Sequence, residues 1–132
     1  MKEDKIDTKK EFSLLKRSMS FAYAGRGVLL FLKGTPNALI DLAIFLMVTL
    51  LGFYFQITSM EWIIIVMVSG FVFVSEAFNT AIEIDIDLTS PEYHPYARDT
   101  KDVAAGAVLI SAVIAVVVGL IIFLPYFFKL VA

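Results

Sequence analysis

Four polar side chains in the middle of the chain are spaced so that they would line one face of a helix. They are Glu76, Asn79, Glu83 and Asp87, in the segment SEAFNTAIEIDID at residues 75–87. Since successive helical residues turn by about 100°, the four fall in one stripe about 80° wide, and Asp85 falls on the opposite side. Carboxylates in apolar, membrane-spanning sequence usually face protein or a wet cavity. The spacing therefore predicts a polar site on one helix face.

Phosphoryl transfer is a reaction that these residue types suit. It needs an acceptor for the proton of a hydroxyl, oxygen ligands for a metal, and cations that meet the phosphates. We predict Glu76 as the general base, Glu83 as a magnesium ligand and Lys101 as the cation that contacts phosphate. Asn79 would position a carboxylate or the metal's water. The sequence has no Walker A motif and no GxGxxG loop, so a nucleotide site must be assembled from helix faces and a loop.

Simpler explanations of the same residues stay open at this point. A polar stripe on a membrane helix often does no more than contact another helix. The single histidine, His94, lies between prolines and could be an ordinary surface residue. The stripe could also line the pore of a small oligomeric channel. A channel would place Glu76, Asn79 and Glu83 around one shared axis, whereas a phosphoryl-transfer site would place them in a cleft open to lipid.

The composition is that of an integral membrane protein. Of the 132 residues, 59% are hydrophobic, well above the usual soluble range, and three long stretches are almost free of charge. We predict a single all-α domain over residues 1–132. It would comprise a disordered tail at 1–8, an interfacial amphipathic helix at 9–33, transmembrane helices at 38–60, 62–86 and 101–128, and a cytoplasmic loop at 87–100.

Charge and composition also bear on orientation and exclude some kinds of site. The chain has no cysteine and one histidine, which excludes a disulfide framework and makes a catalytic triad or a multi-histidine zinc site improbable. Eight of the eleven Lys and Arg residues precede the first apolar stretch. The positive-inside rule then places the N-terminus and the loop in the cytoplasm and the C-terminus outside. Trp62 would lie at the outer interface.

Two further motifs extend the polar stripe into a recognisable pattern. EAFNTAIE at residues 76–83 is followed by EYHP at 92–95 and by ARDTKDVAAGAV at 97–108. In this order and spacing they resemble the prokaryotic diacylglycerol kinase and undecaprenol kinase family, over about residues 12–125. The HP and AAGAV segments are more similar to the undecaprenol kinase branch.

The resemblance implies an activity, an assembly and a location. Members of this family are small homotrimers of the bacterial inner (cytoplasmic) membrane, in which neighbouring subunits share active sites. They transfer the γ-phosphate of ATP, with Mg²⁺, to the primary alcohol of a lipid. We therefore expect a multi-pass lipid kinase with a cytoplasmic N-terminus, a lipid alcohol and the bilayer as partners, and no nucleic-acid partner. Undecaprenol is the first choice of substrate and diacylglycerol the second.

The resemblance also implies roles for individual residues. Glu76 matches the proton acceptor and Glu83 a metal ligand. The positions that match nucleotide or phosphate contacts, or other polar members of the site, are Lys16, Tyr23, Asn79, Asp87, Glu92, Tyr93, His94, Lys101 and Asp102.

One position departs from the family pattern. The family usually has a second metal-ligating glutamate in a Glu-x-Asn segment before the first span, and that position is Thr35 here. A threonine offers a hydroxyl but no negative charge, so we expect weaker Mg²⁺ binding or compensation by another oxygen. Asp41 is the nearest acidic candidate. The departure also keeps open a second possibility, a catalytically impaired relative that binds nucleotide or lipid.

Overall fold

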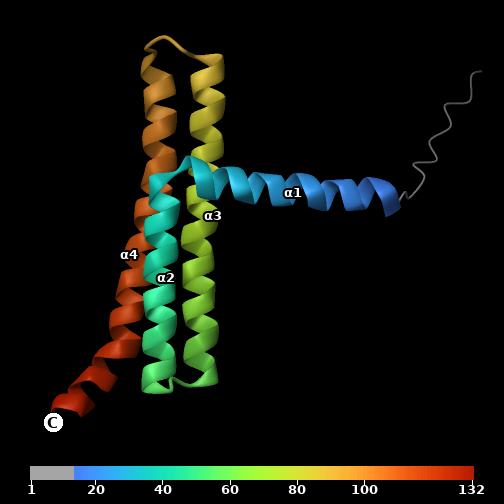
Figure 1. Cartoon of the computed structure of the whole chain (residues 1–132). Coiled ribbons are helices and arrows are strands. Elements are labelled where there is room, and N and C mark those ends of the chain that lie inside the picture. The colour runs from blue at the N-terminus through green and yellow to red at the C-terminus, as the bar shows by residue number, and fades with distance from the viewer. Residues whose placement is uncertain (1–13) are drawn as a thin grey trace, which may run out of the picture.

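The protein is a bundle of three long helices with a fourth helix lying across it (Figure 1). The computed structural model describes residues 14–132, and the side chains from residue 17 onward. The helices are α1 (Leu14–Gly34), α2 (Pro36–Phe55), α3 (Ser59–Thr89) and α4 (Pro95–Val131). Of these, α2, α3 and α4 are long and apolar enough to cross a membrane. The prediction of an all-α fold with one N-terminal helix and three spans is confirmed, and the predicted tail at 1–8 lies outside the described residues.

A single residue separates α1 from α2 and turns the chain. Thr35 has an extended backbone, with φ −120° and ψ 116°, and Pro36 occupies the first turn of α2. Proline disfavours helical geometry in the residue before it but is tolerated at the start of a helix. The two helices therefore meet at a corner, and α1 runs crosswise from the bundle instead of continuing along it (Figure 1).

The three bundle helices differ in length, and this gives the bundle two unlike ends. At 1.5 Å per residue, the 20 residues of α2 span about 30 Å and the 37 of α4 about 55 Å. We call the end that carries the start of α2 and the α3–α4 loop the head end, and the end with the α2–α3 turn the foot end. At the head end α3 and α4 continue past α1 as a two-helix hairpin (Figure 1).

The foot end is fixed by a tight turn and an apolar cluster. Gln56 adopts a left-handed conformation with φ 52°, and Thr58 and Glu61 form a reciprocal capping box at the start of α3. Glu61 Oε2 also accepts a hydrogen bond of 2.8 Å from the hydroxyl of Tyr126 in α4. A cluster of four buried apolar residues also lies at this end: Ile57, Ile65, Ile122 and Phe123.

Several predicted helix boundaries need correction. The loop predicted at 87–100 is confined to residues 90–94, because α3 continues to Thr89 and α4 already begins at Pro95. Pro91 stops α3, whereas Pro95 starts α4, since a proline fits best in the first turn of a helix. His94 is the N-cap of α4. At the foot end, α2 stops at Phe55 and not at residue 60.

Gly52 provides a test of the packing at the foot end. A Cβ atom at this position would lie 2.7 Å from Trp62 Cη2 and 3.1 Å from Ile57 Cδ1. The indole ring is rigid, so we expect Gly52→Ala to lower the free energy of unfolding by about 1–3 kcal/mol. Thermal unfolding of the purified protein in detergent measures this. Gly70→Ala is the matched control, because no atom lies within 4 Å of the Cβ there. Equal melting temperatures for the two variants would contradict this account.

Candidate functional site

Two polar side chains of α3 are buried near the head end. Glu76 is 4% exposed and Asn79 is 9% exposed, and within residues 17–132 these are the buried polar or charged residues. Both belong to the stripe that the helical spacing predicts. Charged groups are rarely buried without partners, so the neighbouring helices must supply them.

The neighbours of Glu76 come from the first turns of α2. The side-chain amide of Asn37 is close enough to hydrogen-bond the Glu76 carboxylate, whereas Asp41 is close enough to repel it as a like charge. Asp41 Oδ2 is buried and, among the described residues, has no hydrogen-bond partner. Asn37 was missed as a site residue, although a polar side chain in the first turn of an apolar helix was a usable signal.

Asn79 links the buried part of the stripe to its outer part. Its Nδ2 donates a hydrogen bond of 3.0 Å to Glu83 Oε1, one turn along α3. This bond fixes the amide, so that Oδ1 is on the side away from Glu83. Within the described chain Oδ1 is buried without a partner. An oxygen in this state is suited to a donor or a cation that the protein itself does not supply.

Asp87 connects the stripe to α4. Its Oδ1 lies 2.5 Å from the Nζ of Lys101, so the pair joins the end of α3 to the second turn of α4. The predicted base, metal-ligand and phosphate-contacting residues therefore follow one another along the head end, from buried Glu76 to exposed Asp87. Asp85, predicted on the other side of the helix, is exposed.

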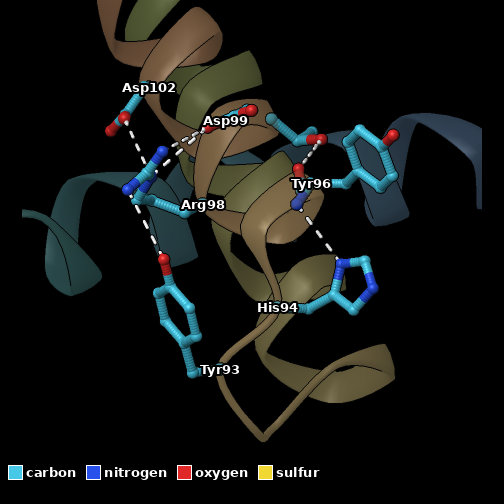
Figure 2. A network of polar contacts seen from close by, with 7 residues as sticks. Tyr93, His94, Tyr96, Arg98, Asp99 and Asp102 are labelled. Carbon is cyan, nitrogen blue, oxygen red and sulfur yellow. Dashed lines mark hydrogen bonds and ion pairs between the residues drawn. The ribbon is translucent and has the colours of Figure 1, made fainter.

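The α3–α4 loop carries a second polar network, centred on Arg98 (Figure 2). The guanidinium donates to Asp99 at 3.0 Å and to the hydroxyl of Tyr93 at 3.4 Å, and lies 3.9 Å from Asp102. Arg98 thus ties two of the predicted nucleotide-contacting residues together. It was missed as a site residue, and its position three residues before Lys101 was the available signal.

The other predicted residues of the α3–α4 loop are His94 and Glu92. The ring of His94 accepts a hydrogen bond of 3.2 Å from the backbone N–H of Tyr96 and caps α4 (Figure 2). Glu92 is exposed. These contacts are structural, and they leave the other ring nitrogen of His94 available.

The predicted residues of α1 are not brought to the same place. Tyr23 is 66% exposed and lies 12 residues before Thr35, which is about 18 Å along a helix that leads away from the bundle. The side chain of Lys16 lies outside the described residues. Thr35 is close to the site, but its hydroxyl donates 2.6 Å to the carbonyl of Phe31 and so points back towards α1.

An apolar cavity lies between α2, α3 and α4 within the membrane-spanning part. Its volume is about 300 Å³, and Asp41 is the ionisable residue among its described lining residues. The rest of the wall is made of side chains such as Phe45, Val68 and Ala115. A long apolar space that ends at an unpaired carboxylate suits a molecule with an apolar body and a polar head.

The described residues of the head end supply only some of the ligands that a divalent cation needs. Within the described chain, no group of three or more His, Cys, Asp or Glu residues is arranged to bind a metal. Magnesium in phosphoryl-transfer sites commonly takes one or two carboxylates, together with water and substrate phosphates. Glu83 and the free Oδ1 of Asn79 fit that limited requirement, since both are oxygen donors on one helix face.

These features define a class of protein: a small, helical, multi-span chain with polar side chains buried at one end of its bundle. Comparison with known proteins identifies the family. Residues 22–123 match the family described as prokaryotic diacylglycerol kinase, and the chain belongs to this family. It is therefore a membrane protein and a lipid kinase, which confirms the prediction from the sequence motifs.

Individual relatives agree with this assignment. The chain is 42% identical over 106 residues to an undecaprenol kinase of Bacillus subtilis, covering 80% of this chain and 86% of the relative. It is 44% identical over 63 residues to a diacylglycerol kinase of Synechocystis, covering 47% of this chain and 36% of the relative. A diacylglycerol kinase of Helicobacter pylori is 33% identical over 75 residues, 57% of each chain.

The hydrogen bond between Asn79 and Glu83 leads to a testable expectation. Asn79→Ala removes the donor that orients Glu83, and loss of such an orienting partner typically costs about 10–100-fold in metal affinity or activity. We expect a fall of that size in kcat/KM for lipid phosphorylation. Asp85→Asn is the control, because this side chain is exposed and on the opposite side of α3. A similar fall in both variants would show that Asn79 has no special role.

Proposed function

We propose that the protein phosphorylates the primary alcohol of a membrane lipid at the head end, with ATP as donor and Mg²⁺ as cofactor. The observation that carries this proposal is the burial of Glu76 beside the start of α2, at the head end of the apolar spans. This position lets one carboxylate meet both an alcohol from the bilayer and a reagent from water.

The reaction follows from the order of the residues along the head end. Glu76 takes the proton of the lipid hydroxyl as the alcohol oxygen attacks the γ-phosphorus of ATP. A new bond forms between that oxygen and phosphorus, and the bond from the γ-phosphorus to the β–γ bridging oxygen breaks, so ADP leaves with that oxygen. Lys101 stabilises the negative charge on the transferred phosphoryl group. Magnesium, when bound, would neutralise negative charge on the phosphates, and Glu83 and Asn79 are the residues that would hold it.

The cavity between α2, α3 and α4 supports a lipid as the acceptor. Its apolar wall suits a hydrocarbon chain, and Asp41 at its polar end is close to Glu76. Undecaprenol is our first choice of acceptor and diacylglycerol the second. The extensive match to an undecaprenol kinase, over 86% of that relative, supports this order.

A homotrimer with shared active sites explains the direction of α1. Within one chain, α1 leads away from the bundle (Figure 1), and Tyr23 belongs to this helix. A neighbouring copy can supply the same helix across a subunit boundary. Most apolar side chains of the bundle are exposed in the single chain, which suits contact with lipid and with other copies.

The orientation follows from charge. We propose that the head end faces the cytoplasm across the bacterial inner membrane, because eight of the eleven Lys and Arg residues precede α2. The α3–α4 hairpin then extends into the cytoplasm, where ATP is available, and α1 lies along the membrane surface.

The direct test is transfer of ³²P from ATP to undecaprenol and to diacylglycerol in the same detergent. We expect product with at least one lipid, and a faster single turnover with undecaprenol. Glu76→Gln keeps the shape of the side chain but removes the base, so we expect a loss of about 10²–10⁴-fold. Asp85→Asn should retain activity. Transfer by Glu76→Gln at the wild-type rate would overturn the assignment of the base.

Thr35 gives a separate expectation about magnesium. A glutamate at this position would add a carboxylate near Asn37 and Glu76, where the present hydroxyl is bonded to Phe31. We expect Thr35→Glu to lower the Mg²⁺ concentration for half-maximal activity by about 10-fold. A magnesium titration of both proteins checks this, with Thr35→Gln as an uncharged control of the same size. If Thr35→Glu needs no less magnesium and is no faster, this account of Thr35 is wrong.

A further inference from the structure

The head-end hairpin is acidic, and its cations are already paired. Residues 83–102 contain two cations, Arg98 and Lys101, and six carboxylates: Glu83, Asp85, Asp87, Glu92, Asp99 and Asp102. Arg98 is held by Asp99 and Asp102 (Figure 2), and Lys101 is held by Asp87. In the described structure this hairpin therefore offers no unpaired cation to an incoming phosphate group.

Arg98 and Lys101 differ in the number of contacts that must break before each side chain is free to bind a phosphate group. Arg98 is bound to two carboxylates and the Tyr93 hydroxyl, so it is held from three sides. Lys101 has one ionic partner among the described residues, and that partner, Asp87, is 69% exposed. Ion pairs that face solvent are weak and exchange partners easily. The ion pairs of both cations face solvent, so the number of partners separates them, and Lys101, with one ionic partner, is the cation that a phosphate group can take over.

Taking Lys101 from Asp87 has a consequence for the ligand. Metal-free ATP would leave Asp87 without its cation and close to the phosphates, where like charges repel. Asp87 lies one turn after Glu83 on the same face of α3, so a cation that arrives with the nucleotide can offer Asp87 a new partner. Only metal-bound ATP offers a new partner to both residues, a phosphate group to Lys101 and the metal ion to Asp87.

We propose that Asp87 is a positioning residue that holds Lys101 until a metal–nucleotide complex arrives, and that this exchange makes the site select metal-complexed over metal-free ATP. The inference rests on the proposed function, in particular on contact between Lys101 and phosphate. It adds a selectivity that neither residue provides alone. Lys101 attracts the phosphates of ATP, and Asp87 repels ATP that carries no metal ion.

The test is equilibrium binding of ATP to the full-length protein in detergent, with Mg²⁺ present and with Mg²⁺ removed by EDTA. Isothermal titration calorimetry gives both dissociation constants without any catalytic turnover if the lipid substrate is omitted. For Asp87→Asn we expect metal-free ATP to bind about fivefold more tightly or better, with a smaller change for Mg-ATP. Asp87→Glu keeps the charge and should retain the wild-type ratio of the two constants.

Asp85→Asn is the matched control, because it removes the same charge two residues away, from an exposed side chain on the opposite side of α3. If it shifts the ratio as much as Asp87→Asn does, the effect is one of net charge and the proposal is overturned. Lys101→Ala separates this proposal from the proposed function. If Lys101→Ala weakens ATP binding and Asp87→Asn leaves the ratio unchanged, only the exchange is wrong. If Lys101→Ala leaves ATP binding unchanged, the phosphate contact is wrong as well.

Discussion

The burial of the Glu76 carboxylate in an apolar bundle is the constraint on which the other features of the head end depend. A carboxylate in hydrocarbon is costly unless polar groups surround it. α2 meets this requirement by beginning at the level of Glu76, so that Asn37 in its first turn reaches the carboxylate. The corner at Thr35, which Pro36 favours, lets α2 begin at this level while α1 leaves sideways. The start of α2 thus supplies a polar partner to the buried charge.

The unequal helix lengths divide the site between two solvents. Near the start of α2 the bundle has three helices, an apolar cavity and buried polar side chains. Beyond that level only α3 and α4 continue, and their polar residues are exposed and paired with one another. In the proposed reaction, a lipid reaches the first region and a nucleotide the second, so that two reagents of opposite solubility meet at one helix face.

The single chain does not bring every expected residue to the head end, and the reason is geometric. A helix as long as α1 that leaves the bundle sideways cannot return Tyr23 to the loop of its own chain. This gap and the large exposed apolar surface of the bundle are the two observations that support the proposed homotrimer. Membrane helices associate through close packing and a few polar contacts, of which the bond between the Ser75 and Ser111 hydroxyls is an example within this chain.

The sequence by itself determined the helix number, the spans and the polar stripe, because these depend on local properties. Hydropathy over about 20 residues defines a span, and the 100° turn per residue places Glu76, Asn79, Glu83 and Asp87 on one face whatever surrounds them. The motifs around them were specific enough to indicate the family. Helix ends were less certain, since Pro91 and Pro95 have opposite effects that depend on which side of the loop each lies.

Only the tertiary structure decided which residues of other helices meet that face. Asn37 reaches Glu76, Asp41 heads the cavity and Lys101 pairs with Asp87 because of how α2 and α4 pack on α3. The sequence separations of these pairs are large, and no local pattern encodes them. The hydroxyl of Thr35 instead donates to the carbonyl of Phe31, one turn back in the chain, and Tyr23 lies exposed on α1. Contacts between distant segments depend on the depth at which each helix starts, and that depth is set by the whole bundle.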